Sequence, residues 1–254
     1  MKKLYSLGIL FLSLVCLFIP IHAHSLDNTK IDWWLVRSKD HTTPRINDKL
    51  HFDLKTYDAY YVGDTSSKVL YLTFDEGYEK GYTPKILDVL KEKDVKAIFF
   101  VTSPYVTTNP DLIKRMVDEG HIVANHSYHH PSMPTYTGDP SKFANEFTDV
   151  ASKYEEITGQ PMVKLFRPPM GHYSEKSLAM TKELGYKTVF WSFAYGDYDV
   201  NKQPSHESAK KIILDNLHNG SIMLLHAVSK TNTEILGEVI DQAREMGYTF
   251  ELFQ

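Results

Sequence analysis

Cysteine is almost absent from this chain of 254 residues, because Cys16 is its only one. Cys16 lies inside an apolar run near the N-terminus and is followed by more apolar residues, so we interpret it as part of that run rather than as a lipid anchor. Without the run, the chain can form no disulfide bond. A hydrophobic core must then stabilise an exported protein, and about 230 residues suffice for one such core.

The chain also lacks an excess of basic residues. It has 28 Lys and Arg against 32 Asp and Glu, a formal charge of −4 that becomes −6 without Lys2 and Lys3. This charge argues against a nucleic-acid or anionic-membrane partner. Heptads, collagen-like repeats and low-complexity tracts are missing too. The aromatic content of 13% is typical both of sugar-binding faces and of a tightly packed core.

The apolar run extends from about residue 4 to residue 20. Lys2 and Lys3 precede it, and Ile21, His22 and Ala23 follow it. This pattern is typical of a secretory signal peptide, residues 1–23, with cleavage after Ala23, and an uncleaved anchor is the alternative. We therefore expect export, with no membrane attachment once the signal is removed.

The remaining chain divides into two parts. Residues 24–65 show no sustained period and are predicted to form an irregular segment that packs on the core, whereas residues 66–254 contain regularly spaced strand-like runs. These runs lie at 69–74, 96–102, 122–125, 164–166, 188–193, 221–225 and 249–253.

Segments of helical periodicity lie between the strand-like runs, for example "TPKILDVLKEK", "NPDLIKRMVDEG" and "SEKSLAMTKELGY". Asn109 and Ser174 are the expected N-caps of the last two, and Gly120 and Gly185 their expected ends. Strands that alternate with helices predict an α/β fold with a largely parallel sheet. About seven such units favour a single-domain barrel over the alternative, a doubly wound sheet.

Polar residues follow several of these strand-like runs, at the ends where a βα barrel gathers its reactive groups. Neighbouring strand residues point to opposite sides, so Asp75 and Glu76 could have different roles, one as a proton acceptor and one as a cation ligand. A solvated acidic turn is the alternative for this pair. The polar residues at the strand ends are Asp75, Glu76, His126, Arg167, Asp197 and His226.

His126 and His130 lie four residues apart in "ANHSYHHP". In a helical turn this spacing would place both imidazoles on one face, where with a carboxylate they would suit zinc or another divalent ion. Histidines at this spacing also occur on solvated faces, but the carboxylate pair at another strand end favours a metal site. His129 would point elsewhere and is interpreted as structural.

Four motifs, "TFDEG", "HSYHH", "RPPMG" and "LLHAV", occur in this order and resemble the signature motifs of the polysaccharide deacetylases, the NodB-homology carbohydrate esterases of family 4. The resemblance covers about residues 66–253. Within the family, the sequence resembles the spore-cortex branch, which deacetylates N-acetylmuramic acid on the way to muramic δ-lactam. It implies a distorted (β/α) barrel with seven strands, a hydrolase of a linear amide bond in peptidoglycan glycan strands, a divalent ion such as zinc, and a monomer.

The resemblance also implies roles by position. Asp75 matches the general base, which takes a proton from metal-bound water, and His226 matches the general acid, which protonates the departing amine. His126 and His130 match the two metal-binding histidines. Such a set would suit amide hydrolysis, because a poor leaving group needs an acid and a weak nucleophile needs a base.

Further residues are implied to contact the substrate. The backbone N–H of Met170 would meet the oxyanion, and Leu224 would pack near the acetyl methyl group. Asp197 and Tyr198 match a later Asp-Trp pair of the family. Tyr195 and Tyr198, just beyond a strand end, are candidates for stacking on sugar rings.

Two positions depart from the family pattern. Glu76 stands where many members have a second aspartate that binds the metal, and our hypothesis is that Glu76 binds the ion in spite of its extra methylene. Ala194 stands three residues after Trp191, where many relatives have an aspartate that sets the protonation of the catalytic histidine. His226 would then need another partner.

Arg167 has three interpretations. It could orient Asp75 by charge-assisted hydrogen bonds, directly or through Asp197. It could instead bind the lactyl carboxylate that distinguishes muramic acid from N-acetylglucosamine, because a guanidinium matches a carboxylate bidentately. It could also be a salt bridge that only fixes the "RPP" turn.

The sequence thus predicts an exported, extracytoplasmic, metal-dependent deacetylase that acts on peptidoglycan at the cell wall or spore cortex, with muramic acid units as the expected site. Two alternatives stay open. One is a deacetylase of N-acetylglucosamine in peptidoglycan or chitin-like oligomers. The other is a sugar-binding paralogue with little or no turnover, although a binding protein has no need for both an acid and a base.

Overall fold

The structure, a computed structural model, describes residues 26–254. The expected signal peptide and Cys16 lie outside the described residues. Within 26–254, none of the helices combines the length and the apolar character that a membrane crossing requires.

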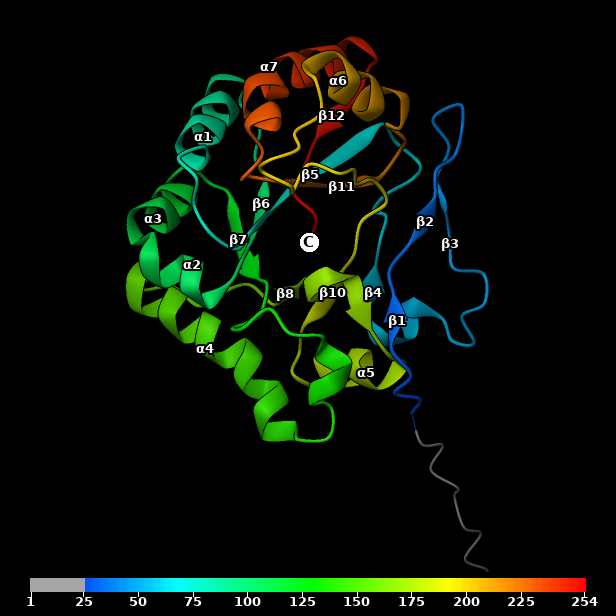
Figure 1. The fold of residues 1–254 in the computed structure, drawn as a ribbon, viewed down its shortest axis with the longest axis vertical. Coiled ribbons are helices and arrows are strands. Elements are labelled where there is room, and N and C mark those ends of the chain that lie inside the picture. Colours follow the sequence, from blue (N-terminus) through cyan, green and yellow to red (C-terminus); the bar gives the residue numbers. More distant parts are fainter. Residues whose placement is uncertain (1–25) are drawn as a thin grey trace, which may run out of the picture.

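The centre of the molecule is a curled sheet in which every pair of neighbouring strands is parallel. Figure 1 shows the strands curling around the C-terminus of the chain. A further strand, β12 (Thr249–Phe250), pairs in parallel with the first residues of β5. Along the sheet the order is β11 (Ser221–His226), β5 (Val69–Glu76), β6 (Ile98–Val101), β7 (Ile122–Asn125), β8 (Leu165–Phe166), β10 (Lys187–Val189) and β4 (Ala59–Tyr60).

The sheet is a half-barrel, not a closed barrel. From β5 to β10, consecutive parallel strands lie side by side without the reversal of order that defines a doubly wound sheet. Within residues 26–254, the two edge strands β4 and β11 do not pair with each other, and on that side β11 is reached only by single bridges, from Val62 to Ser221 and from Phe193 to Met223. The predicted distorted barrel of about seven parallel strands is therefore confirmed, and the doubly wound alternative is excluded.

Helices cover the outside of the half-barrel (Figure 1). They form where the sequence has its helical periodicity, although the three segments quoted above account for only α1, α3 and α5. The helices are α1 (Thr83–Glu92), α2 (Ser103–Thr108), α3 (Pro110–Asp118), α4 (Pro140–Thr158), α5 (Glu175–Glu183), α6 (His206–Asp215) and α7 (Lys230–Glu245), with short 3₁₀ turns η1 (Leu54–Tyr57), η2 (Met133–Tyr136) and η3 (Pro169–Gly171).

The predicted helix boundaries hold with one difference. Ser174 caps α5 in a capping box with Ser177, and Gly120 and Gly185 have φ angles of 80° and 81°, which glycine adopts without strain. Asn109 precedes α3, but its side chain does not cap that helix. It donates a hydrogen bond back to the carbonyl of Tyr105 in α2, the preceding helix.

The N-terminal segment is less irregular than predicted. β1 (Ile31–Asp32) pairs with β9 (His172–Tyr173), and β2 (Leu35–Val36) pairs with β3 (Arg45–Ile46), both antiparallel. β4 joins the main sheet beside β10, so the expected boundary after residue 65 separates one strand from its sheet. Strands of two residues are too short to show a period in the sequence, which explains the difference.

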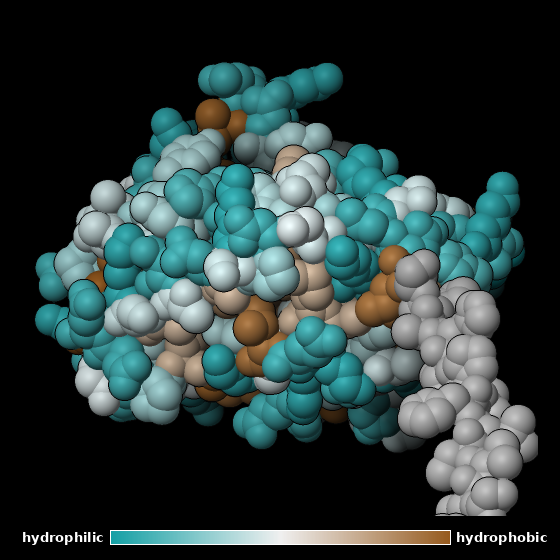
Figure 2. Space-filling model, turned by 90° about the horizontal axis from the view of Figure 1, so that it is seen from below, coloured by the Kyte–Doolittle hydropathy of each residue, from teal (hydrophilic) through white to brown (hydrophobic). Residues whose placement is uncertain are grey.

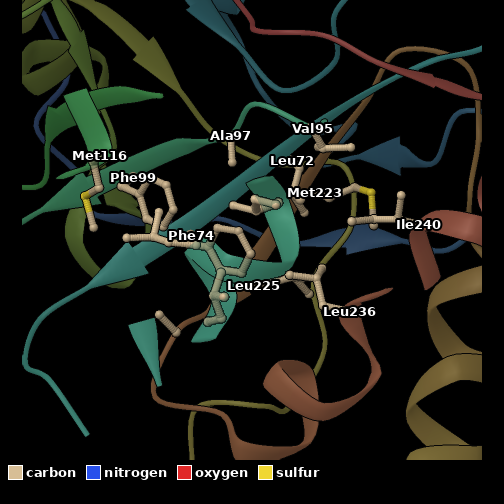
Figure 3. Packing of buried hydrophobic residues seen from close by; sticks show 14 of the residues in the cluster. Leu72, Phe74, Val95, Ala97, Phe99, Met116, Met223, Leu225, Leu236 and Ile240 are labelled. Atoms are coloured by element: carbon tan, nitrogen blue, oxygen red, sulfur yellow. The ribbon is translucent and has the colours of Figure 1, made fainter. Parts of the chain in front are cut away.

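β5 sends its side chains alternately into two hydrophobic clusters. Val69 and Tyr71 face the inside of the half-barrel together with Phe100. Leu72 and Phe74 face the helices, where the ring of Phe74 stacks on Phe99 at 5.3 Å between centroids (Figure 3). The same alternation continues to the end of the strand, so the last two side chains leave on opposite faces.

Candidate active site

A cavity of about 870 Å³ opens at the C-terminal ends of the strands, where β5, β7 and β11 end. Parallel strands end at one edge of the sheet, so polar residues from distant parts of the sequence converge there. The structure brings together most of the predicted site residues at this cavity. Those that line it are Asp75, His126, His130, Met170, Tyr195, Tyr198, Leu224 and His226.

Asp75 and His226 are the two groups best placed for proton transfer. They are direct partners in the parallel register of β5 and β11, so both side chains leave the sheet on the same face. Burial alone would raise the pKa of Asp75, but the guanidinium of Arg167 and two nearby imidazoles outweigh burial and hold this pKa below its usual value. Asp75 is therefore a carboxylate that can accept a proton.

Arg167 is fully buried behind Asp75 and does not line the cavity. Its Nη1 donates to Asp75 Oδ1 at 2.7 Å and to the hydroxyl of Thr73 at 2.9 Å. Its Nε and Nη2 donate to the carbonyls of Val189 and Phe190 at 3.1 and 3.4 Å. With its three nitrogens engaged and no exposed surface, Arg167 is placed to orient Asp75 directly and not to contact a substrate carboxylate.

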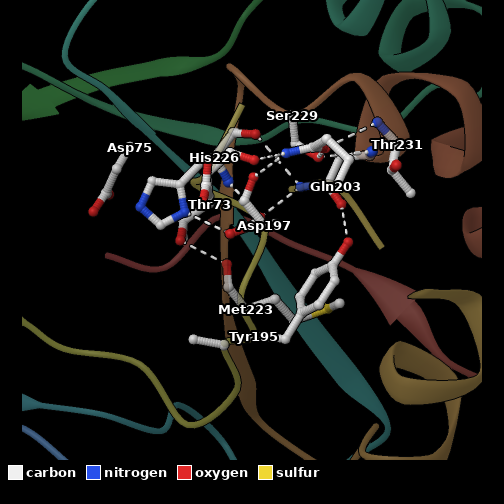
Figure 4. Close-up of polar contacts among 12 residues, drawn as sticks. Thr73, Asp75, Tyr195, Asp197, Gln203, Met223, His226, Ser229 and Thr231 are labelled. Carbon is white, nitrogen blue, oxygen red and sulfur yellow. Dashed lines mark hydrogen bonds and ion pairs between the residues drawn. The ribbon is translucent and has the colours of Figure 1, made fainter. Parts of the chain in front are cut away.

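His226 is paired with Asp197 (Figure 4). Its Nδ1–H donates to Asp197 Oδ1 at 2.7 Å, and its backbone N–H donates to Oδ2 at 2.8 Å. Burial alone would lower the pKa of His226, but the hydrogen bond and the charge of Asp197 raise it above its usual value. Asp197 thus supplies the partner that Ala194 cannot, and, being fully buried, it does not have the substrate contact we expected for it.

Asp197 is itself held by Asn232 and Gln203, which the sequence analysis missed, and through Asn232 by Tyr195, which it had named for a different role (Figure 4). The amide Nδ2 of Asn232 donates to Asp197 Oδ2 at 2.6 Å, and the hydroxyl of Tyr195 donates to the amide oxygen of Asn232. Gln203 Nε2 donates to the backbone carbonyl of Asp197 at 2.9 Å. Asn232 lies 35 residues from Asp197 in sequence and belongs to none of the four motifs, so no sequence signal marked it.

The two histidines of "HSYHH" converge through a different local structure from the one predicted. Residues 126–130 form a loop, not a helical turn, and both Ser127 and His130 have left-handed backbone angles, with φ of 72° and 58°. The rings of His126 and His130 nevertheless lie 4.9 Å apart between centroids. The backbone N–H of His129 donates to Glu146 Oε2 at 2.8 Å and its Nδ1 is hydrogen-bonded to Oε1 at 2.8 Å, so His129 has a structural partner although it also borders the cavity.

His126 is prepared for a role as a neutral nitrogen ligand. Its Nδ1–H donates to the carbonyl of Arg167 at 2.8 Å, which leaves the lone pair on Nε2, 3.5 Å from Asp75 Oδ2. Burial lowers the pKa of His126 to about 4 and also lowers the pKa of His130. Both imidazoles are therefore uncharged near neutral pH, the form in which histidine binds metals.

Glu76 leaves β5 on the face opposite to Asp75 and does not line the cavity. It is fully buried, its Oε1 accepts a hydrogen bond from the hydroxyl of Thr83 at 3.2 Å, and its Oε2 has no partner in the described part of the chain. Burial, with repulsion from Glu79 and Asp75, raises the pKa of Glu76 well above its usual value. This placement argues against Glu76 as a ligand of an ion bound by the histidines.

The donor set fits a divalent ion only in part. His126 and His130 supply two neutral nitrogens, and Asp75 is the carboxylate beside them. Among residues 26–254, no group of three or more His, Cys, Asp or Glu side chains is arranged to hold a metal ion. A bound ion would therefore need ligands beyond the two imidazoles.

Met170 and Leu224 border the cavity on two other sides. Met170 has φ 57° and ψ 6°, a left-handed conformation that is uncommon outside glycine and that recurs at functional sites. Its side chain is exposed, so the backbone can serve the cavity whatever side chain stands there. Leu224 lies two residues before His226 on β11 and adds an apolar wall.

The two predicted sugar-stacking tyrosines differ in their surroundings. Tyr195 is buried, and its hydroxyl is bound to Asn232, so it lines the cavity as part of the support of Asp197. Tyr198 is 63% exposed, and its ring centroid lies 5.8 Å from that of His226. Of the two, Tyr198 has the free aromatic face that a sugar ring would need.

Comparison with known proteins identifies the family of this chain. Residues 62–189 match the polysaccharide deacetylase family. The peptidoglycan-N-acetylmuramic acid deacetylase PdaA of Bacillus subtilis is 45% identical over 229 residues, 90% of this chain and 86% of PdaA. A peptidoglycan-N-acetylglucosamine deacetylase of Bacillus cereus is 31% identical over 188 residues, 73% of this chain and 86% of that protein.

A solved structure is similar over almost its whole length. The structure of Bacillus subtilis PdaA, a family 4 carbohydrate esterase, superposes with a TM-score of 0.85 at 44% identity, covering 89% of this chain and 96% of that one. The fold is thus shared over this length. The chain belongs to the polysaccharide deacetylase family, the family 4 carbohydrate esterases.

Proposed function

We propose that this protein removes N-acetyl groups from peptidoglycan glycan strands, and that its target is the N-acetylmuramic acid unit. One observation carries the catalytic part of the proposal. Asp75 and His226, register partners at one cavity, are each fixed by a buried, oppositely charged partner, Arg167 and Asp197. A sugar-binding protein without turnover has no use for an ionised base beside an acid with a raised pKa.

Asp75 acts as the base in this proposal. Arg167 holds one carboxylate oxygen at 2.7 Å, so the other oxygen, Oδ2, is left to accept a proton from the attacking water. As the water attacks the acetyl carbon, negative charge develops on the carbonyl oxygen. The backbone N–H of Met170 is the donor we assign to that oxygen.

His226 acts as the acid. Amide cleavage requires protonation of the departing nitrogen, because an amide anion is a very poor leaving group. The bond to Asp197 directs the proton of Nδ1 away from the cavity and leaves Nε2–H to face the substrate. Leu224 beside it offers the apolar contact that an acetyl methyl group fits.

The proposal includes a divalent ion, with zinc as the first choice, bound by His126 and His130. When bound, such an ion activates water and polarises a carbonyl. The neutral state of both imidazoles supports this part of the proposal. Glu76 is not included among the ligands because its side chain faces Thr83 on the other side of β5.

The choice of muramic acid rests on the 45% identity with PdaA, which is named for that activity. The weaker likeness to the Bacillus cereus enzyme, named for N-acetylglucosamine, keeps the glucosamine unit as the second candidate. The N-terminal sequence supports export. We propose that the protein acts as a monomer at the cell wall or spore cortex, where deacetylation would precede muramic δ-lactam formation. No residue of the cavity is assigned to lactam closure.

The test is acetate release by the purified protein lacking residues 1–23, with and without a chelator and with zinc restored. The substrates are peptide-stripped peptidoglycan and chito-oligomers, and mass spectrometry of the digested glycan identifies the unit that lost its acetyl group. We expect chelator-sensitive loss from muramic units alone. Acetate from chito-oligomers would favour the glucosamine alternative, and no acetate from any substrate with zinc supplied would favour a binding protein.

A further inference from the structure

Half of the large hydrophobic side chains that are exposed among residues 26–254 lie at the cavity. On the face shown in Figure 2, hydrophobic residues form small patches among hydrophilic ones. Three of the exposed large hydrophobic residues, Tyr78, Met170 and Tyr198, line the cavity. The cavity therefore has apolar surface at its rim beyond the part that holds Asp75 and His226, and Tyr78 has no role in the mechanism above.

Tyr78 lies on the loop of residues 77–82, between β5 and α1, and hydrogen bonds to the side chain of Glu79 order this loop. Oε1 of Glu79 accepts hydrogen bonds from the backbone N–H groups of Lys80 at 2.9 Å, of Tyr82 at 2.8 Å and of Gly81. Its Oε2 accepts one from the hydroxyl of Tyr105 at 3.2 Å. A single carboxylate thus ties the loop together, and the ring of Tyr78 is carried by a pre-ordered backbone.

The ring of Tyr78 is both exposed and oriented. It is 50% exposed, and the ammonium group of Lys80 lies over it at 5.6 Å from the centroid. The ammonium group occupies one face of the ring and leaves the other face available. An exposed aromatic face on an ordered loop is what a sugar ring requires, because its C–H groups pack on the π face and a tyrosine side chain has few rotatable bonds to immobilise.

We propose that Tyr78 forms a subsite for a sugar unit next to the one that is deacetylated, so that the cavity binds a stretch of glycan strand and not a single residue. The inference rests on the proposed function, since it assumes that the occupant is a glycan. Tyr78 binds the neighbouring ring and takes no part in proton transfer. Its contribution therefore grows with the length of the substrate.

The test compares Tyr78→Ala with the unmodified enzyme on a short and a long substrate, a disaccharide and an octasaccharide of the peptide-stripped glycan. We expect kcat/KM on the octasaccharide to fall about tenfold through a higher KM, with kcat unaffected, while the disaccharide value stays within about twofold. Tyr78→Phe, which keeps the ring, should restore most of the octasaccharide value. Trp34→Ala, which removes a 44% exposed aromatic residue outside the cavity, is the matched control.

The outcomes separate this inference from the proposed function. If the unmodified enzyme releases no acetate from any glycan, the proposed function fails. If it is active and Tyr78→Ala reduces kcat/KM equally on both lengths, or reduces neither, the subsite is refuted while the deacetylase assignment stands. A loss with Trp34→Ala as large as with Tyr78→Ala would also refute the subsite, because the effect would then not depend on the cavity.

Discussion

Asp75 and Glu76 carry the same functional group on adjacent residues, and their environments shift their pKa values in opposite directions. Both are buried, which favours the neutral acid. Asp75 gains a guanidinium at 2.7 Å, and its pKa falls below the usual value. Glu76 gains only a hydroxyl group and acidic neighbours, so its pKa rises. The direction in which the side chain leaves the strand, together with the partner found there, decides which of the two can be a base.

The first prediction concerns the metal. Glu76→Gln should leave the zinc affinity of the purified protein unchanged, because residue 76 faces Thr83 and not the histidines. His130→Ala should abolish tight binding, since one of two imidazoles is lost. Isothermal titration calorimetry measures both. A tenfold loss of affinity in Glu76→Gln, in a variant that remains folded by circular dichroism, would mean that Glu76 turns into the cavity when the ion binds.

The second prediction concerns pH. His226 must be protonated to act as an acid, so kcat should fall as pH rises through its pKa, which Asp197 holds above the usual value. Asp197→Asn removes that charge and leaves burial, which lowers the pKa. The alkaline limb of the kcat profile should therefore move to lower pH, with kcat reduced about a hundredfold.

Asp199→Asn is the control for this pH experiment, because Asp199 is exposed and two residues further along the same loop. It should leave the alkaline limb in place. An unshifted limb in Asp197→Asn would show that another group sets the protonation of His226.

At the residue scale, the sequence predicted which side chains reach the cavity better than it predicted their partners. The order and spacing of the motifs were enough to place Asp75, His126, His130 and His226 at the cavity. The C-terminal ends of parallel strands converge at one edge of the sheet, and this convergence does not depend on the conformation of the loops. Arg167 was identified, but its full burial depends on packing that no local pattern encodes. His126 and His130 converge in a loop in which Ser127 and His130 have left-handed backbone angles, whereas a helical turn was predicted. The spacing of two residues does not specify the conformation of the backbone between them.

At the scale of elements, α7 supports the active site although no proposed catalytic residue lies on this helix. Asn232 in its first turn contacts Asp197, the partner of His226. Its N-cap, Ser229, accepts from the backbone N–H of Asn232 and donates to Gln203, the residue that also binds Asp197. The first turn of α7 and the loop after β10 are thus joined around one buried carboxylate. Asn232 is held in a single orientation, because its NH₂ must face the carboxylate and its oxygen the hydroxyl of Tyr195.

The third prediction tests this arrangement. Asn232→Ala should lower kcat about tenfold with KM unchanged, because a hydrogen bond to a buried charge is lost behind His226 and not in the substrate site. Steady-state kinetics on one glycan substrate gives both constants. Glu234→Ala, an exposed position on the same helix, should change neither. A higher KM with an unaltered kcat in Asn232→Ala would instead indicate a disturbance of the cavity wall.

Element length explains what could be predicted from the sequence and what could not. β5 and β11, with eight and six residues, have apolar runs long enough to recognise. β4 has two residues, and its place beside β10 follows from tertiary pairing alone. Asn109 was expected to cap the helix after it and instead contacts the helix before it, since a short polar side chain can satisfy either neighbour.

At the scale of the whole molecule, the N-terminal segment supports the active-site wall from behind. The ring of Trp33 stacks on Phe190 at 4.2 Å, and its Nε1–H donates to the carbonyl of Trp191 at 3.1 Å. Its backbone N–H donates to the carbonyl of Gly171 at 2.8 Å. Trp191 and Gly171 both line the cavity, so a residue far from every catalytic motif supports the wall next to Met170.

Gly171 shows how close this contact is. A Cβ atom at position 171 would lie 2.7 Å from Trp33 Cβ and 2.9 Å from the ring of Trp191, and φ is 66°. The backbone after Met170 can therefore approach the N-terminal segment only with glycine at this position. The segment and the loop that carries the proposed oxyanion donor are packed as one unit.

The last prediction uses the two adjacent tryptophans as a matched pair. Trp33 is 8% exposed and Trp34 is 44% exposed. Trp33→Ala should lower the free energy of unfolding by about 3–5 kcal/mol through the cavity it leaves, and should lower kcat as the Met170 loop loses its support. Trp34→Ala should change stability by no more than about 0.5 kcal/mol. Urea denaturation measures the change in stability, and acetate release measures the change in kcat. An equal loss of stability in both variants would contradict the prediction that Trp33 belongs to the hydrophobic core and Trp34 does not.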